Sequence, residues 1–190
     1  MHTMMRFNVL HTILRRIFSL LVMLLVTVSC DKAENTYSNL AARFTVDQVI
    51  SIAPLRISCE SKGEFCLIYM GGSNFVFKSF TNEQPRPITD LDRQKGFIMG
   101  LAGFIVGQPP IPDDSNPMVC YDAACPNCYA DQMVTKRLKL ISNDMAQCTC
   151  GREYNLSDHG YVKNAKDGDR RLIRYRAVYQ RATDILIINN

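Results

Sequence analysis

Four of the eight cysteines in this chain stand in two close pairs, and these pairs are the part of the sequence best suited to chemistry. Cys125 and Cys128 form a C-x-x-C pair, Cys148 and Cys150 form a C-x-C pair, and 19 residues lie between the pairs. Two C-x-x-C pairs about 15 to 20 residues apart are typical of structural zinc sites. A short gap in a turn lets both thiolates face one metal, and a second pair completes a tetrahedron. The spacing therefore predicts a four-cysteine metal site, with zinc as the first candidate.

Disulfide formation is the alternative use of the same sulfurs, because the second pair is one residue shorter than the zinc pattern. A bond between Cys148 and Cys150 would be strained, so disulfides would instead join Cys125 or Cys128 to one of them. Cys125 and Cys128 alone would resemble a redox dithiol, although the chain lacks the βαβ pattern of thioredoxin-like proteins. The residues alone leave metal binding and disulfide formation open.

The first 29 residues have the composition of a secretory signal. Met1–Ser29 contains three arginines and no acidic residue, and an apolar run covers Ile17–Val28. A basic segment followed by a short apolar run is typical of a signal peptide. The run is shorter than the roughly 20 residues that a membrane-spanning helix needs. We therefore expect residues 1–29 to be removed on export.

The leader ends at Thr27-Val28-Ser29-Cys30, which resembles the lipobox of bacterial lipoproteins. The best-matching boxes have Leu where this chain has Thr27. The resemblance implies that Cys30 becomes the N-terminus and carries acyl chains, whose buried CH₂ groups each contribute about 0.8 kcal/mol to membrane binding. Ordinary secretion, with Cys30 as a spare thiol, is the alternative. We expect an exported, membrane-anchored protein, at the outer membrane or cell surface rather than at the inner membrane.

Removal of the leader changes the charge and the histidine count of the chain. The formal net charge falls from +4 to +1, and His159 is the one histidine left. A nearly neutral chain offers no basic stripe for nucleic acid. Residues 30–40 are polar and are expected to form a tether from the lipidated cysteine. Residues 41–190 are expected to form a single domain.

Short apolar or alternating runs separated by turn residues dominate this domain and predict strands. The predicted strands are Ala42–Val46, Phe65–Tyr69, Phe75–Phe80, Phe97–Met99, Phe104–Val106, Val119–Tyr121, Leu138–Ile141, Leu172–Tyr179 and Ile185–Ile188. No segment has a long helical period, and residues 82–94 are expected to hold one helical turn at most. The pattern predicts an all-β fold, an antiparallel sandwich or barrel.

Four segments with cysteine, glycine and strand motifs follow one another in a known order. They are Tyr121–Cys128, Cys150–Gly160, Leu172–Arg176 and Leu186–Asn190. Together they resemble the C-terminal part of Rieske-type domains, and most of all small envelope lipoproteins with Rieske-like folds. The resemblance covers residues 96–190 well and residues 42–80 loosely. It implies a Rieske-like antiparallel β-sandwich or barrel with two rubredoxin-like knuckle loops at one tip.

The resemblance does not extend to the ligands of the Rieske cluster. That cluster needs two cysteines and two histidines, whereas the exported chain has only His159. Asn127 stands where the first histidine would fall, and Cys150 where the second would. The standard two-histidine cluster is therefore excluded, and the candidates for an all-cysteine site are zinc, a rubredoxin-like iron or a four-Cys iron–sulfur cluster. Zinc is favoured, because an iron–sulfur protein needs a dedicated export route and Arg15-Arg16 lacks the flanking pattern of a twin-arginine signal.

Three further cysteines lie outside the two pairs. Cys59 and Cys66 are expected on two neighbouring strands, either as a cross-strand disulfide or as two small half-buried residues. Cys120 is expected to be a buried free thiol in a strand.

No grouping of catalytic acid, base and nucleophile can be found around a single histidine, and His159 in a polar turn is expected to be solvated. The sequence therefore favours a non-catalytic binding or structural module that meets an unknown envelope protein or ligand. Two alternatives are an electron-transfer protein of Rieske type, with iron or an iron–sulfur cluster, and a thiol-disulfide redox protein.

Overall fold

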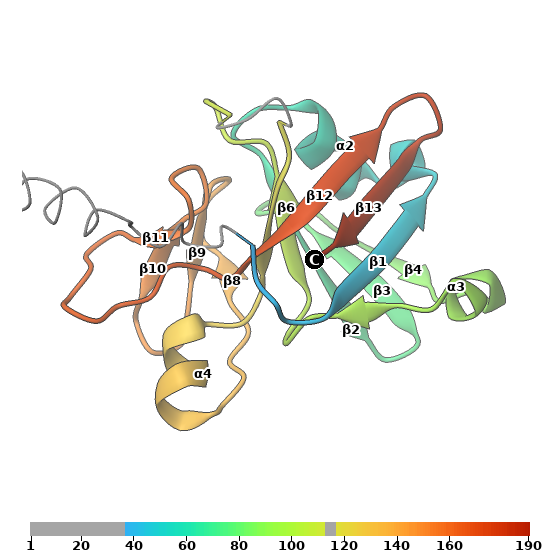
Figure 1. Cartoon of the computed structure of the whole chain (residues 1–190). Coiled ribbons are helices and arrows are strands. Elements are labelled where there is room, and N and C mark those ends of the chain that lie inside the picture. The colour runs from blue at the N-terminus through green and yellow to red at the C-terminus, as the bar shows by residue number, and fades with distance from the viewer. Residues whose placement is uncertain (1–36, 113–116) are drawn as a thin grey trace, which may run out of the picture. The chain divides into compact units, whose positions relative to one another are not determined.

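The structure is a computed structural model that describes residues 37–112 and 117–190 (Figure 1). The predicted leader, Cys30 and most of the predicted tether lie outside the described residues. Among the described helices, none is both long and apolar enough to cross a membrane.

Nine strands form one antiparallel sheet. They are β1 (Ala42–Asp47), β2 (Phe65–Gly71), β3 (Asn74–Lys78), β4 (Glu83–Pro87), β5 (Ile98–Met99), β6 (Phe104–Gly107), β7 (Val119–Asp122), β12 (Arg174–Gln180) and β13 (Ile185–Asn189). Their order across the sheet is β4-β3-β2-β6-β7-β12-β13-β1-β5. Strands β1 and β3 lie near opposite ends of this order, yet Phe44 of β1 packs edge to face on Phe75 of β3, with ring centroids 5.0 Å apart. This contact shows that the sheet curls over on itself. The predicted antiparallel all-β architecture is confirmed at this level.

A second, smaller antiparallel sheet contains four short strands. They are β8 (Lys139–Leu140), β9 (Met145–Gln147), β10 (Glu153–Asn155) and β11 (Tyr161–Val162), in the order β11-β10-β9-β8. This small sheet lies beside β6 and β7, on the other side from β1 and β13 (Figure 1).

The helices are short. They are the 3₁₀ helix η1 (Val49–Ser51) and the α-helices α2 (Ala53–Glu60), α3 (Asp90–Lys95) and α4 (Pro126–Gln132). The sequence predicts neither α2 nor α4, because a helix of seven or eight residues is too short to establish a helical period. Helix α3 exceeds the single turn expected in residues 82–94, and a capping box formed by Thr89 and Asp92 explains its start.

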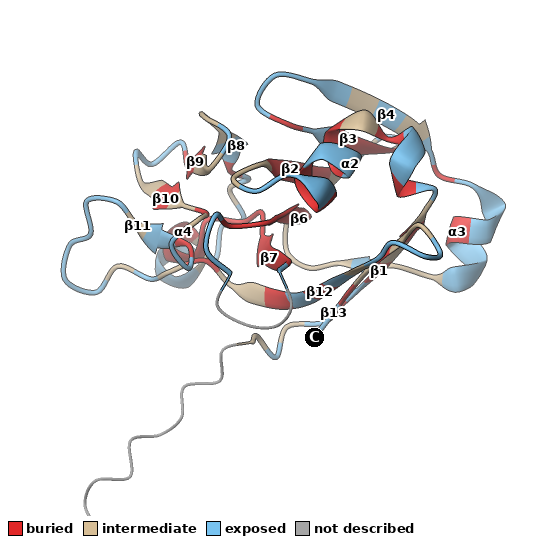
Figure 2. Ribbon diagram, turned by 90° about the horizontal axis from the view of Figure 1, so that it is seen from above, coloured by how far each residue is buried: buried red, intermediate tan, exposed pale blue. Residues whose placement is uncertain are grey.

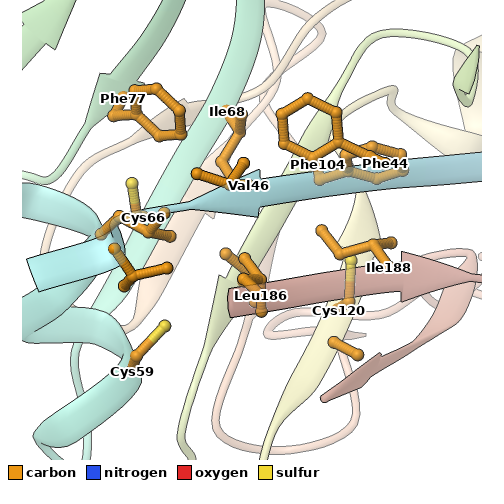
Figure 3. Close-up of a cluster of buried hydrophobic side chains, with 14 of the residues drawn as sticks. Phe44, Val46, Cys59, Cys66, Ile68, Phe77, Phe104, Cys120, Leu186 and Ile188 are labelled. Carbon is orange, nitrogen blue, oxygen red and sulfur yellow. The ribbon is translucent and has the colours of Figure 1, made fainter. Parts of the chain in front are cut away.

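Strands β6 and β7 and the first four residues of β2 are buried on both faces and separate two hydrophobic clusters. Figure 2 shows β6 and β7 buried along their length. Successive side chains of a strand point to opposite faces, so Cys120 of β7 enters one cluster while Val119 and Tyr121 enter the other. The main core contains Phe44, Val46, Cys59, Cys66, Ile68, Phe77, Phe104, Cys120, Leu186 and Ile188 among others (Figure 3). The second core contains Phe65, Leu67, Ile105, Tyr121, Leu138, Ala146, Tyr154, Leu156 and three of the paired cysteines.

Cys59 and Cys66 do not lie on two neighbouring strands as the sequence predicts. Cys59 is in helix α2 and Cys66 is in β2, and both are fully buried free thiols in the main core. Burial raises the pKa of Cys59 to about 12, so its thiol stays protonated at neutral pH. Neither the cross-strand disulfide nor the half-buried alternative is found, because the turn around Gly63 joins a helix to a strand. The prediction for Cys120 is confirmed: it is a buried free thiol.

Candidate metal centre

The first cysteine pair lies at the start of helix α4. Cys125 is the N-cap residue, with extended backbone (φ −68°, ψ 113°), and Pro126 takes the first helical position. Proline fits there because that position needs no N–H donor and its φ is already helical. The N–H of Tyr129 donates to the Cys125 carbonyl at 3.1 Å, and this first turn brings Cys128 to the same side as Cys125. The resemblance implied a knuckle loop here, whereas the structure has a helix.

The second pair lies in the turn between β9 and β10. The N–H of Cys148 donates to the carbonyl of Arg152 at 3.0 Å, and the N–H of Gly151 donates to the carbonyl of Cys148 at 2.9 Å. Gly151 has a φ of 91°, which glycine adopts without the steric cost that other residues meet. The N–H of Cys150 points at the sulfur of Cys148, 3.5 Å away, so the turn gathers both sulfurs on one side.

The fold brings the two pairs together. The four Sγ atoms of Cys125, Cys128, Cys148 and Cys150 all lie within 4.8 Å of one another. Across the pairs, Cys125 Sγ lies 3.9 Å from Cys150 Sγ, and Cys128 Sγ lies 3.8 Å from Cys148 Sγ. A tetrahedral zinc ion with four bonds of about 2.3 Å holds its sulfurs about 3.8 Å apart. The four cysteines are therefore placed where they could bind one metal ion.

The sulfurs are not covalently paired in the structure. All seven cysteines of the described residues are free thiols, and the sulfur contacts of 3.8 and 3.9 Å are almost twice the length of a disulfide bond. The contacts join one segment to the other, which is the arrangement that a shared metal ion requires.

Burial differs sharply among the four cysteines. Cys125, Cys128 and Cys148 are buried in the second core, whereas Cys150 is exposed. Burial raises the pKa of Cys128 and of Cys148. Burial would also raise the pKa of Cys150, but hydrogen bonds from the backbone and guanidinium of Arg152 and from neighbouring thiols lower it to about 6. Because a cysteine binds metal as the thiolate, binding of a metal by all four sulfurs releases protons.

Two buried polar side chains orient the first pair. Tyr154 Oη lies 3.1 Å from Cys125 Sγ and accepts a hydrogen bond from Asn127 Nδ2 at 2.9 Å. In the contact between Tyr154 Oη and Cys125 Sγ either the phenol or the thiol can donate. Asn127 is held in turn by Arg170, whose N–H donates to Asn127 Oδ1 at 2.9 Å and whose carbonyl accepts from Asn127 Nδ2 at 3.1 Å. Such outer hydrogen bonds fix the orientation of metal ligands.

Asp122 holds the chain that leads into the first pair. Its buried carboxylate accepts hydrogen bonds from the backbone N–H groups of Leu101 at 2.7 Å, Ala102 at 3.3 Å and Ala124 at 2.8 Å, and from Tyr175 Oη at 2.9 Å. Burial raises the pKa of this carboxyl, and the four donors oppose that rise. Asp122 therefore ties the residue before Cys125 to the loop that precedes β6.

Arg152 links the exposed cysteine to a cleft. Its Nη1 lies 3.7 Å from Cys150 Sγ, and its Nε donates to Asp169 Oδ1 at 2.8 Å. The cleft beside it has a volume of about 400 Å³. Its walls include Cys150, Arg152, Glu153, Val162, Lys166 and Asp169.

His159 does not take part in the cysteine cluster. It lies in an exposed turn with a φ of 48°, and its ring centroid is 6.0 Å from that of Tyr161. The prediction of a solvated turn residue is confirmed.

The sequence contains the four cysteines and their motifs but not the side chains that support them. Tyr154 and Asp122 lie inside the two motifs, but the spacing does not show that their side chains are buried and directed at the cysteine segments. Asn127 stands out in the sequence only as a replaced histidine. Comparison with known protein families, curated proteins and solved structures found no match to this chain.

Proposed function

We propose that this protein is a membrane-anchored, non-catalytic β-domain protein of the cell envelope, in which four cysteines hold one structural zinc ion. The observation that carries the proposal is the convergence of four sulfurs within 4.8 Å from two separate segments. Four thiolates at tetrahedral spacing are the ligand set of structural zinc sites.

A structural role is supported by the number and the burial of the ligands. Four protein ligands leave no position for water or substrate, which a catalytic zinc ion needs. The ion would join the start of α4 to the turn between β9 and β10. The small sheet has strands of only two or three residues and therefore few hydrogen bonds between strands. A metal cross-link would supply the stability that these hydrogen bonds do not.

A single ion suits the cluster better than a two-iron cluster does. A two-iron cluster attaches its four thiolates to two iron atoms in pairs, which spreads the sulfurs more widely than the 4.8 Å found here. One zinc ion and one rubredoxin-like iron fit the spacing equally well, and elemental analysis of the purified chain distinguishes them.

The Rieske-like assignment is part of the proposal. Its support is the antiparallel curled sheet and the meeting of the two cysteine segments beside β7 and β12. Because one fold hosts many functions, the assignment by itself names no activity for this protein.

The envelope location rests on the leader and on Cys30. The first described residues after them run beside β12, where the N–H of Ser38 donates to the carbonyl of Arg174 at 2.9 Å. A lipid on Cys30 would thus anchor the domain through a short polar segment, and the partner would be an envelope protein or ligand that the domain binds.

Electron transfer by a single iron is the second candidate. The exposure of Cys150 favours it, because an exposed ligand sulfur gives electrons a short path between the metal and a partner. Zinc has no redox chemistry, so the nature of the ion separates the two candidates.

The test uses the full-length chain with a C-terminal tag, produced in a bacterium that processes lipoproteins and extracted from membranes in detergent. We expect about one zinc ion per chain by elemental analysis and no visible absorption band. We also expect an intact mass that lacks residues 1–29 and includes acyl chains on Cys30. One iron with visible charge-transfer bands would overturn zinc in favour of electron transfer, and a metal-free chain would overturn the metal site.

A matched pair of variants separates ligand loss from general damage. Cys128→Ala removes a buried ligand, whereas Cys120→Ala removes a buried thiol of the main core that takes no part in the cluster. We expect the first variant to lose the bound metal and the second to retain it. Equal retention in both variants would count against Cys128 as a ligand.

A further inference from the structure

We propose that Cys150 is the site at which a peroxide oxidises the cysteine cluster, and that its first disulfide partner is Cys125. The inference rests on the proposed metal site, and it adds a modification site, a reagent class and a pairing to it.

Access to the sulfurs is the first argument. Cys150 is exposed and forms part of the wall of the cleft of about 400 Å³, whereas Cys125, Cys128 and Cys148 are buried. A small oxidant that enters the cleft therefore meets the sulfur of Cys150 before any other. Oxidation of cysteines follows exposure, and Cys150 is the exposed one of the four cluster sulfurs.

The contact between the sulfurs is the second argument. Cys125 Sγ lies 3.9 Å from Cys150 Sγ with the geometry of a hydrogen bond, and it belongs to the other segment. Cys128 Sγ makes the corresponding contact with Cys148 Sγ at 3.8 Å. These two contacts correspond to one of the three ways in which four cysteines can form two disulfides, and the proposal adopts that pairing.

Bond formation requires one sulfur to move, and there is open space beside the turn that holds Cys150. The sulfurs must approach from 3.9 Å to about 2.0 Å. Gly151 adjoins Cys150 and has no atom near the place where a side chain would stand, so the turn meets no obstruction there. Cys125 lies at the start of α4, and its sulfur is in hydrogen-bond contact with Tyr154 Oη. We therefore expect the turn that holds Cys150, rather than Cys125, to move.

The chemical steps balance with a peroxide as the oxidant. The thiolate of Cys150 attacks one peroxide oxygen, so that an S–O bond forms, the O–O bond breaks, and the leaving hydroxide takes a proton to become water. The thiol of Cys125 then attacks the sulfenic sulfur, loses its proton and displaces the second oxygen as water. Two electrons pass from the two sulfurs to the peroxide. Two of the four metal ligands are thereby lost, so the ion is released.

The experiment treats the full-length reduced protein with one equivalent of hydrogen peroxide. Zinc release is followed with a chromogenic chelator, remaining thiols are alkylated, and tandem mass spectrometry maps the disulfides. We expect a Cys125–Cys150 link to appear together with zinc release, and a Cys128–Cys148 link to follow with a second equivalent. A Cys125–Cys128 link as the first product, with Cys150 still reduced, would overturn the proposal.

The rate of peroxide consumption in two variants tests which sulfur reacts first. Cys150→Ser should consume peroxide roughly tenfold more slowly than the unmodified chain, because the remaining cluster sulfurs are buried, and Cys120→Ala should react at the unmodified rate. An unchanged rate in Cys150→Ser would contradict the assignment of the reactive sulfur.

Failure of the metal site and failure of this inference give different results. The metal content of the protein before treatment tests the metal site alone. If that content is zero, the disulfide map of the reduced, peroxide-treated chain still shows whether Cys150 pairs first with Cys125.

Discussion

The main core and the second core share strands β2, β6 and β7, and each contains three buried cysteines. The main core is almost entirely apolar, with Phe104 packed edge to face on Tyr175 at a centroid distance of 5.6 Å. The three cysteines of the second core gather with Cys150 in one cluster beside the hydroxyl of Tyr154, and the strands that cover this core have two or three residues. Hydrophobic burial can account for the first region, whereas the second, on our proposal, needs a metal ion to cross-link its short segments.

Removal of the metal should separate the two regions most clearly. A strong chelator at neutral pH is expected to abolish the hydrogen-exchange protection of β9 and β10 while β2 and β3 keep theirs. The reason is that structural zinc contributes roughly 10–16 kcal/mol in small metal-dependent folds, far more than two short strands supply. Hydrogen exchange with and without chelator, followed by mass spectrometry, measures the difference. Equal loss of protection in both regions would mean that the two cores unfold as one unit.

A large-to-small substitution in the main core should lower the stability of the protein without changing its metal content. Phe104→Ala removes a fully buried ring and is expected to lower the free energy of unfolding by about 3–5 kcal/mol. At temperatures where the variant stays folded, its metal content should equal that of the unmodified chain. Chemical denaturation and elemental analysis on the same sample check both statements. Loss of metal at full folding would show that the cores are coupled.

Tyr154→Phe should affect the second core alone. The change removes the hydroxyl beside Cys125 Sγ and leaves a buried donor of Asn127 without this acceptor, at a cost of about 1–3 kcal/mol. Loss of such an outer hydrogen bond lowers metal affinity roughly 10- to 100-fold, which competition with a chelator of known affinity measures. Tyr179→Phe is the matched control, because its hydroxyl bonds to Asp184 at 3.0 Å, away from the cysteines. Similar metal affinities in the two variants would show that the Tyr154 hydroxyl does not support the metal site.

Acid should produce the smallest of these effects, at the cap of α3. Burial raises the pKa of Asp92, but hydrogen bonds from Thr89 and the charge of Arg86 outweigh burial and hold that pKa below its ordinary value. A carboxyl whose folded pKa is lowered contributes stability that is present above its unfolded pKa and is lost as the pH falls through the folded pKa. Asp92→Asn should therefore cost about 1 kcal/mol at neutral pH and progressively less below about pH 4. Urea unfolding from pH 6 to pH 3 measures the difference, and a constant difference would refute this role.

Nine predicted strands correspond to β1, β2, β3, β5, β6, β7, β8, β12 and β13, because their apolar runs are strong local signals. The sequence predicts no strand at β4, because Pro85 and Pro87 argue against one. The structure places β4 at the edge of the sheet, where proline can be accommodated. Strands β9, β10 and β11 are too short to show an alternating pattern. The turn around Gly151 pairs β9 with β10, and the turn that ends at Gly160 pairs β10 with β11.

The identity and spacing of the four candidate ligands follow from the sequence by itself, because a C-x-x-C or C-x-C pair is a local feature of the chain. Only the tertiary structure decided that the pairs meet, that Cys150 alone is exposed, and that Tyr154 and Asn127 support Cys125. These properties depend on contacts between residues about 20 to 45 positions apart, which burial of β7 and the small sheet brings together. Helix α4, which begins at Pro126, was likewise decided by the tertiary structure. So short a helix is stabilised mainly by packing, here the burial of Pro126, Asn127 and Cys128.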